Sequence, residues 1–489
     1  DVLGSRGLGD VYKRQMVDVA VIGCGVIGAA VAMELAKRQV SVVVLEKNND
    51  VAMGTTKANS AILHAGYDPE PGTLMARLNV RGVELAKEIC ENLDVHRKQI
   101  GSLVLAFTDE EVPHVEKLYE NAKANGVPGA KIISGEEVAK MEPNLSPVKC
   151  ALYAPSAAIV NPWEFAIAMA ENAVENGAEV RLNSPVTAIE KTENGWFLKT
   201  PSGDVEARYV VNAAGVNAGE VHEMVAEENF KTIPCRGEYY LLDKTEGTRV
   251  NHVIFQCPSK VGKGVLVSPT VHGNLIVGPN AEDVDSVANT AAGLAFVAEM
   301  AKKSVPSINF RENIRNFAGV RANTDQSDFV IEMAADGFLD LAGMKSPGLS
   351  AAAAVGEEAV KLLEEAGLSA PKKENVVTKR HKVRFKELSA EEKAELVKKN
   401  PAYGRVICRC ETITEGEIID ACHEIIPPCS IDGVKRRAGS GMGRCQGGFC
   451  GPRVLEILAR ELKKDPEEIM QDGAGTVILT GRTKEGGER

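Results

Sequence analysis

The stretch VDVAVIGCGVIGAAVAMELAKRQVSVVVLEK, residues 17–47, decides the fold class of this chain. It contains a run of apolar residues, a glycine turn, a segment of helical periodicity and a second apolar run, an order typical of a strand, a helix and another strand. The crossover is long enough to join two parallel strands. We therefore expect an α/β, Rossmann-like domain with a doubly wound sheet.

The glycine turn has the spacing of a dinucleotide-binding motif, with Gly23, Gly25 and Gly28 between the first strand and the helix. The first glycine permits a tight turn, the second lets the backbone approach a pyrophosphate, and the third allows close packing of helix on strand. Glu46 ends the second strand, near the position expected of the acid that bonds a ribose hydroxyl. The motif predicts a bound dinucleotide and leaves FAD and NAD open.

Composition and charge exclude several classes of protein. The chain has 489 residues, of which 44% are hydrophobic, so we expect two or three folded domains. A net charge of −11 argues against a nucleic-acid binder. Apolar runs stay well short of the ~18–20 residues of a membrane-spanning helix. We expect a cytoplasmic protein without a transmembrane segment, held at most peripherally at the inner face of the membrane through a partner.

Changes in composition predict the domain boundaries. Residues 1–15 lack a signal-peptide core, and we expect them to be a non-native remnant. Residues 16–370 should form the main domain, 371–404 a basic linker with a short helix capped by Ser389, and 405–480 a small cysteine-rich domain. The main domain should divide into a discontinuous nucleotide-binding part, at about 16–80, 150–220 and 315–370, and an α+β substrate part with an antiparallel sheet, at about 80–150 and 220–315.

Four cysteines near the C-terminus have the spacing of a metal centre, Cys408-x-Cys410 and Cys445-x4-Cys450. Four soft thiolates suit a [2Fe-2S] cluster. Zinc is the competing occupant, although its all-thiolate sites more often have two to four residues between paired cysteines. The two other cysteines of this region fall outside the pattern, and we expect them to be small buried residues.

Three segments resemble the glycine-oxidase and D-amino-acid-oxidase superfamily of FAD enzymes: TTKANSAILHAGY (55–67), VVNAAG (210–215) and AGMKSPGLSAAAAVG (342–356). In that superfamily the corresponding regions return to one flavin, so the resemblance implies FAD. It adds a set of expected cofactor-binding residues to those of the glycine motif: Thr55, Ser60, Ala214, Gly215, Gly343, Gly348, Leu349 and Ser350.

Residues 405–465, with ICRCE and DGVKRRAGSGMGRCQGGFCGP, resemble the bacterioferritin-associated-ferredoxin-like (BFD-like) [2Fe-2S] domain. A flavin domain followed by such a domain resembles the large subunits of anaerobic glycerol-3-phosphate dehydrogenases. The resemblance implies oxidation of sn-glycerol 3-phosphate to dihydroxyacetone phosphate. Hydride would go to FAD, and single electrons would pass through [2Fe-2S] to a second flavoprotein, another electron-acceptor subunit or a quinone.

Oxidation of a small anion by a flavin needs a base for the hydroxyl proton and a group that holds the anion. His64 is our candidate base or flavin contact, with a packed structural histidine as the alternative. Arg321 suits a phosphate or carboxylate, because its planar fork matches either. Lys345 should lie near flavin or substrate. Both cations could instead form surface ion pairs, and Arg236 and Tyr239 are weaker candidates.

The sequence is also compatible with three other functions. HAGYDPEPGTLMARL (64–78) and RGEYY (236–240) also resemble L-2-hydroxyglutarate oxidases or dehydrogenases, which usually lack the cysteine domain. Oxidation of an amino acid or opine is a third possibility. A non-enzymatic electron-relay subunit would be a fourth. The basic residues Lys435, Arg436, Arg437 and Arg444 either offset the charge of the cluster, dock a redox partner or form a solvated face.

Overall fold

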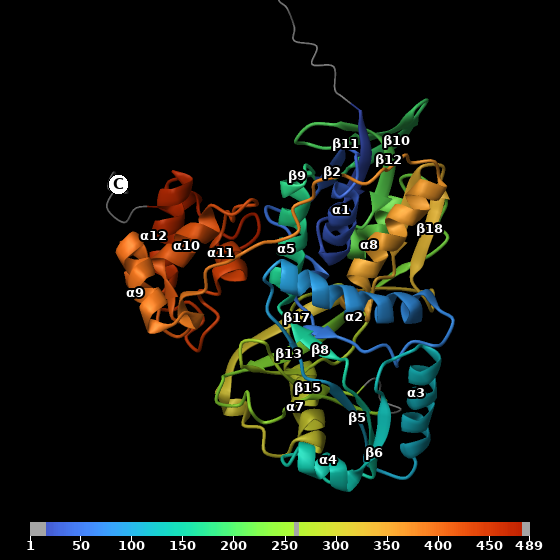
Figure 1. Cartoon of the computed structure of the whole chain (residues 1–489), viewed down its shortest axis with the longest axis vertical. Helices are drawn as coiled ribbons and strands as arrows, with labels where there is room; N and C mark the ends of the chain where they lie inside the picture. The colour runs from blue at the N-terminus through green and yellow to red at the C-terminus, as the bar shows by residue number, and fades with distance from the viewer. Residues whose placement is uncertain (1–15, 259–263, 482–489) are drawn as a thin grey trace, which may run out of the picture.

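The computed structural model describes residues 16–258 and 264–481. They form a nucleotide-binding part, a second part built on another large sheet, and a C-terminal part that lies beside the first two (Figure 1). The expected remnant at residues 1–15 lies outside the described residues, so that expectation stays a prediction. Among the described helices, none has both the length and the apolar character needed to cross a membrane.

The first sheet is centred on β1 (Val17–Ile22), which pairs in parallel with β2 (Val42–Leu45) and with β12 (Val205–Asn212). β9 (Glu179–Arg181) and β19 (Phe338–Ala342) extend the parallel arrangement. The buried stretches Val19–Ile22 of β1 and Val42–Leu45 of β2 are continuous apolar runs, as expected where both faces of a sheet are covered. The prediction that a distant strand near residue 210 joins the N-terminal unit is confirmed.

Three antiparallel strands complete this sheet: β10 (Ala188–Thr192), β11 (Gly195–Lys199) and β18 (Val330–Ala335). Helices α1 (Val26–Ala36), α5 (Pro162–Glu175) and α8 (Gly348–Glu365) share one hydrophobic core on one face. The small residues of α8 let it approach its neighbours closely, and α2 (Leu74–Asn92) packs against it. The strand-turn-helix predicted around β19 and α8 is therefore confirmed.

The second sheet has the order β17-β13-β16-β15-β14-β5-β7-β6 and is antiparallel except for the parallel pair β14 and β5. β13 and β17 pair along almost their whole length. A three-stranded sheet, β3-β8-β4, is also present. The bounds are β3 (Ile62–Leu63), β4 (Arg97–Gln99), β5 (Ser102–Ala106), β6 (Lys131–Ser134), β7 (Cys150–Ala154), β8 (Ala158–Val160), β13 (Thr232–Leu242), β14 (Val253–Gln256), β15 (Leu266–Pro269), β16 (Leu275–Gly278) and β17 (Asn313–Thr324).

Helices α3 (Val112–Ala124), α4 (Gly135–Met141) and α7 (Ala291–Ser304) accompany the second sheet, and the short helix α6 (Ala218–His222) packs on β12 and β19 of the first. After α8 the chain crosses to the C-terminal part and forms α9 (Ala390–Lys399), whose predicted start is confirmed by a capping box between Ser389 and Glu392. The cysteine-bearing domain consists of β20 (Val406–Cys408), β21 (Ile413–Thr414), α10 (Glu415–Cys422), α11 (Ile431–Ala438) and α12 (Gly451–Leu462).

Candidate functional site

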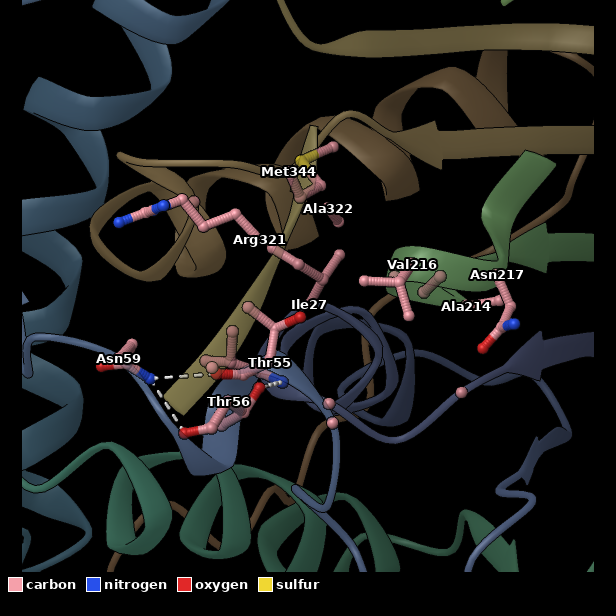
Figure 2. A pocket seen from close by; sticks show the side chains of 18 of the residues that line it. Ile27, Thr55, Thr56, Asn59, Ala214, Val216, Asn217, Arg321, Ala322 and Met344 are labelled. Carbon is pink, nitrogen blue, oxygen red and sulfur yellow. Dashed lines mark hydrogen bonds between the residues drawn. The ribbon is translucent and has the colours of Figure 1, made fainter. Parts of the chain in front are cut away.

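A cavity of about 430 Å³ lies at the carboxyl ends of β1, β2 and β12, where open α/β sheets bind their ligands. Residues far apart in the sequence line it together (Figure 2). They come from segments around 22–27, 45–48, 54–64, 184–186, 213–224, 319–322 and 344–349, with Tyr239 from β13. The fold therefore gathers the three segments that carry the resemblance to flavin enzymes at one cavity.

Nine of the twelve expected cofactor-binding residues line this cavity: Gly23, Gly25, Glu46, Thr55, Ser60, Ala214, Gly215, Gly348 and Leu349. The other three lie just behind its wall. A Cβ on Gly28 would lie 1.9 Å from the Gly23 carbonyl oxygen, so this glycine serves the helix packing. Ser350 Oγ accepts a hydrogen bond from the His64 amide at 2.7 Å, and Gly343 forms a turn beside Thr324.

The start of α1 has the features that a pyrophosphate needs. Gly25 is the N-cap residue and offers no side-chain cap, and the first turn contains no acidic residue. The positive end of the helix dipole therefore faces the cavity, and no acidic residue of the helix itself competes for it. The Val26 amide instead donates to Thr56 Oγ1 at 3.0 Å, which braces the turn from the next segment. Thr56 was not predicted, because a lone threonine in a loop carries no recognisable signal.

Glu46 braces the same turn from the second strand. Its Oε2 accepts from the Cys24 amide at 2.8 Å and its Oε1 from the Asn48 amide at 2.9 Å. A carboxylate has further lone pairs for a ribose hydroxyl. Burial, and then the charge of Glu46, raise the pKa of the Cys24 thiol well above its usual value. Cys24 is therefore a protonated turn residue and not a thiolate. These features fit the nucleotide half of FAD.

The other end of the cavity carries His64, Ser60 and Tyr239. His64 Nε2 lies 3.4 Å from Ser346 Oγ, and its ring packs 5.6 Å from the Phe255 ring, centroid to centroid. The Tyr239 hydroxyl lies 3.1 Å from Ser60 Oγ. A histidine and several hydroxyl groups thus line a cavity whose walls are largely apolar.

Arg321 projects from β17 into the cavity, away from Val216 and Asn217 (Figure 2). Its Nη2 donates to the Asn280 carbonyl at 3.0 Å and its Nη1 to Cys235 Sγ at 3.3 Å. Within the described ranges it forms no ion pair, so neutral acceptors alone hold the guanidinium. Its positive charge is therefore available to an anion in the cavity.

The other two cationic candidates, Lys345 and Arg236, differ in whether they line the cavity. Lys345 lines the cavity, and its Nζ donates to the Gln326 carbonyl at 2.9 Å. Arg236 points elsewhere: its guanidinium pairs with Glu282 and donates to the Ala288 carbonyl. Arg236 is therefore a structural ion-pair residue, whereas Lys345 stays a candidate for the site.

The four predicted metal ligands come together as two pairs of thiols. Cys410 Sγ and Cys445 Sγ are 3.8 Å apart, and Cys408 and Cys450 are hydrogen-bonded through their thiols. The first distance is about that of two thiolates on one tetrahedral metal, given metal–sulfur bonds of ~2.3 Å. Among the described residues, no three metal-ligating side chains converge as a single ion would require. Two pairs fit a cluster of two irons better than one zinc ion.

Backbone amides surround these sulfurs. The hydrogen bond from Cys450 and amides of Gly441 and Glu411 lower the pKa of Cys408 to about 6. Amides of Phe449 and Gly447 likewise lower the pKa of Cys445. Gly441 and Gly447 both have positive φ, which brings their backbone close to the sulfurs. Amide donors around anionic sulfur are what an iron-sulfur cluster needs.

Of the four basic residues singled out in this domain, three bind acids elsewhere in the chain. Arg436 and Arg437 are buried against Asp50, which follows β2, and Arg444 pairs with Asp243 and Glu312. A solvated basic face is therefore wrong for Arg436 and Arg437, whereas Arg444 forms ion pairs but stays 60% exposed. Asp50 was not predicted, since an aspartate after a strand looks like an ordinary loop residue.

The remaining residue of that group, Lys435, is 8% exposed and reaches an acid only distantly, Asp432 at 3.9 Å. Burial, countered in part by Asp432, lowers the pKa of Lys435 to about 8. Lys435 thus keeps its predicted candidacy as a cation that offsets the charge of the cluster.

A dinucleotide cavity at the edge of a parallel sheet, a second sheet beside it and a separate four-thiol domain define a flavin oxidoreductase with an iron-sulfur centre. The chain belongs to the FAD dependent oxidoreductase family, whose model matches residues 18–362. Residues 406–460 match the BFD-like [2Fe-2S] binding domain. The protein is accordingly an FAD-dependent oxidoreductase, and FAD and a [2Fe-2S] cluster are its cofactors.

Two relatives and one solved structure are named for glycerol 3-phosphate or L-α-glycerophosphate. The chain is 52% identical over 476 residues to a glycerol 3-phosphate dehydrogenase of Caloramator mitchellensis, covering 96% of this chain and 99% of that protein. It is 34% identical to a glycerol 3-phosphate oxidase of Mycoplasma pneumoniae, over 71% of this chain and 94% of the oxidase. The structure of the L-α-glycerophosphate oxidase of that organism with FAD bound superposes with a TM-score of 0.71 and 32% identity, over 75% of this chain and 98% of the other.

Proposed function

We propose that this protein is an FAD-dependent dehydrogenase that oxidises sn-glycerol 3-phosphate to dihydroxyacetone phosphate and passes the electrons through its [2Fe-2S] cluster to another protein. The observation that carries the proposal is the similarity to the Caloramator mitchellensis dehydrogenase, which extends over both cofactor domains. Arg321 supports it locally, because its guanidinium bonds only neutral acceptors among the described residues and so suits a phosphate.

The side chains of the cavity divide the work of such a reaction. When bound, FAD supplies the acceptor for the hydride that leaves the hydroxyl-bearing carbon. Arg321 would hold the phosphate, and Lys345, on the same side of the cavity as Ser346, would add a second positive charge. His64 would take the hydroxyl proton at Nε2, with Ser346 Oγ 3.4 Å away to orient the ring.

L-2-hydroxyglutarate oxidation is the main competing function. The chain is 31% identical to the human mitochondrial L-2-hydroxyglutarate dehydrogenase, but the match covers 54% of this chain and 60% of the human protein. Both substrates are anions with a secondary hydroxyl group, so the cavity alone does not separate them. The extent of the match favours glycerol 3-phosphate.

Anaerobic bleaching of the flavin tests the substrate directly. Glycerol 3-phosphate should bleach the FAD absorbance, and L-2-hydroxyglutarate should not; the opposite pattern would overturn the proposal. Arg321→Gln should retain FAD and require at least tenfold more glycerol 3-phosphate, which corresponds to about 1.4 kcal/mol. Arg208→Gln, which alters an exposed arginine paired with Asp18, is the matched control and should behave as the wild type.

The exposed edge of the cysteine site supports an outgoing electron route. Cys410 is exposed, and Phe449 beside Cys450 is 85% exposed. Arg409 lies between two of the ligands and forms no ion pair within the described residues. Aromatic residues and arginine are enriched at protein interfaces. We therefore expect an acidic electron-acceptor protein to bind here, and a second flavoprotein or attachment to the inner membrane face through it stays a prediction.

Two protein acceptors of opposite charge test this route. If Arg409 steers the acceptor, the substrate-reduced protein should reduce an acidic blue-copper protein faster than a basic cytochrome c at low salt, despite the net charge of −11 of the whole chain; the opposite order would show that the acceptor site is not basic. Phe449→Ser should slow the reduction of the blue-copper protein and leave the reduction of ferricyanide unchanged. If the wild type and Phe449→Ser reduce the blue-copper protein at equal rates, Phe449 does not contribute to docking.

A further inference from the structure

A buried group of three charged side chains joins the two cofactor domains. Asp50 Oδ2 accepts from Arg436 Nη2 and from Arg437 Nη1, both at 2.9 Å, and Asp50 Oδ1 accepts from Arg437 Nη2 at 2.8 Å. The exposed fractions of these side chains are 0%, 2% and 0%. We refer to Asp50, Arg436 and Arg437 as the Asp50 cluster. It connects the loop after β2 of the nucleotide-binding sheet with α11 of the iron-sulfur domain.

Charges buried this deeply are stable only with partners. Burial alone would raise the pKa of Asp50, but the charges and hydrogen bonds of Arg437 and Arg436 hold it below its usual value. Arg437 Nη2 and Nε also donate to the Ile426 carbonyl. Removal of one partner from such a group leaves an uncompensated buried charge. The two domains are therefore held together in one specific arrangement at this point.

Further contacts lead from the Asp50 cluster to the wall of the flavin cavity. Arg436 Nη1 donates to Asp472 Oδ1 at 2.7 Å, and Lys57 Nζ donates to Asp472 Oδ2 at 2.9 Å. Lys57 ends the short 3-10 helix Thr55–Lys57, and Thr55 and Thr56 line the cavity. These ion pairs thus extend from Arg436 through Asp472 to Lys57, which directly follows Thr55 and Thr56 of the cavity wall.

The Asp50 cluster reaches the iron-sulfur site through α11. This helix ends at Gly439, which has a positive φ, and the chain then enters the loop that carries Gly441. The Gly441 amide donates to the sulfur of Cys408. A shift of α11 would therefore move the backbone that surrounds the metal ligands.

Other ion pairs between the domains are more exposed. Arg444, for example, pairs with Asp243 at 3.0 Å with 60% of its side chain exposed, and Lys244 pairs with Glu411 at 2.7 Å with 41% exposed. Exposed pairs contribute little to stability in water. The Asp50 cluster is therefore the most deeply buried of these charged contacts and should contribute most to the orientation of one domain against the other, beside the partly buried Arg380, which lies between Glu171 and Glu424.

We propose that Asp50 is a positioning residue for electron transfer: through Arg436 and Arg437 it holds the iron-sulfur domain at one distance from the flavin cavity. The inference rests on the proposed route from FAD to the cluster. Electron tunnelling slows steeply as two centres move apart, so release of this contact should slow the internal transfer. Reaction of the substrate at the flavin should not change, because Asp50 does not line the cavity.

Asp50→Asn in the full-length protein loaded with FAD and cluster tests this inference. The substitution preserves the shape of the side chain and removes the charge that two buried guanidinium groups require. Flavin bleaching by glycerol 3-phosphate, followed by anaerobic stopped flow, should stay within twofold of wild type. The paramagnetic signal of the reduced cluster, followed by freeze-quench, should appear at least tenfold more slowly. Limited proteolysis within residues 371–404 should become faster.

Two further variants make the test specific. Glu179→Gln removes the same kind of charge from an exposed pair with Arg181 and should leave both rates unchanged. Arg437→Lys retains the charge but loses the two-pronged contact with Asp50, and should slow cluster reduction less than Asp50→Asn does. If Asp50→Asn does not fold, the rate of cluster reduction in Arg437→Lys takes its place as the test. A wild-type rate of cluster reduction in whichever of the two variants folds would overturn the inference.

Light-driven reduction of the flavin separates this inference from the proposed substrate. If glycerol 3-phosphate fails to bleach the wild-type flavin, the proposed function is wrong, but photoreduced flavin still reports on transfer to the cluster. A wild-type rate of cluster reduction in Asp50→Asn after photoreduction would overturn the positioning role, whatever the substrate is.

Discussion

The flavin cavity and the cysteine site are built in opposite ways. The cavity draws its lining from seven segments between residues 22 and 349, which only the fold brings together. The cysteine site draws its ligands from residues 408–450, within a domain that has its own small core. A site formed from one short segment can therefore be recognised from spacing, whereas a site formed from many segments depends on strand order.

The two sites also stabilise charge by different means. At the cysteine site, backbone amides such as those of Gly441 and Gly447 point at the sulfurs. In the flavin cavity, a helix start without acidic residues faces the nucleotide end, and the side chain of Arg321 faces the other end. A substitution in one site should therefore leave the cofactor of the other site bound.

Cys445→Ser should abolish the cluster and spare the flavin. Cys445 shares its pair with Cys410 at 3.8 Å, and a hydroxyl group is a poor substitute for a thiolate on iron. The paramagnetic signal of the reduced [2Fe-2S] cluster should disappear while the FAD absorbance per chain stays constant. Cys429→Ser is the control, since that thiol bonds the Asn49 carbonyl outside the site. A surviving signal in Cys445→Ser would show that the ligand set is wrong.

Gly28→Ala should lower the FAD content and leave the iron-sulfur cluster in place. The new Cβ would lie 1.9 Å from the Gly23 carbonyl oxygen, so helix and strand must separate. We expect the free energy of unfolding to fall by about 1–3 kcal/mol, as for other overpacked cores, and the FAD content to drop severalfold. Gly451→Ala, where the Cβ would meet nothing within 4 Å, is the control. Equal loss of the cluster signal in Gly28→Ala would contradict the independence of the sites.

Gly237→Ala should weaken substrate binding without loss of FAD. Its Cβ would lie 2.6 Å from Arg321 Nη2 and 2.8 Å from Pro279 Cβ, so the guanidinium must move. The KM for glycerol 3-phosphate should rise roughly tenfold, which corresponds to about 1.4 kcal/mol. Steady-state kinetics with a dye acceptor measures this change. If the arginine moves and the KM for glycerol 3-phosphate does not change, Arg321 does not bind the phosphate.

His96 should give a small pH dependence of stability where the linker meets the main domain. Burial lowers the pKa of His96, but its bonds to Glu164 and Glu387 outweigh burial and raise the pKa above 6.5. The resulting stabilisation is full below pH 6.5 and is lost as the pH rises through the folded-state pKa. Urea unfolding of wild type and His96→Gln between pH 5.5 and 8 should differ most at low pH. A difference that does not vary with pH would contradict the pKa shift.

Sequence reasoning recovered the elements whose evidence is local. The helix start at Ser389, the strand near residue 210 and the strand-turn-helix around β19 and α8 all follow from short patterns. It could not choose among the alternatives for Arg436 and Arg437, and the solvated face is wrong for both, because a run of charges gives no information about partners hundreds of residues away.

The β-α-β unit, the glycine turn and the two pairs of cysteines can be read from the chain alone, because each depends on neighbours along it. The folded packing is needed to see that Arg321 bonds only neutral acceptors among the described residues, and that Asp50 is buried against α11. The physical reason is that the free energy of a buried charge depends on what surrounds it in space. That environment is set by the packing of distant segments and leaves no trace in local spacing.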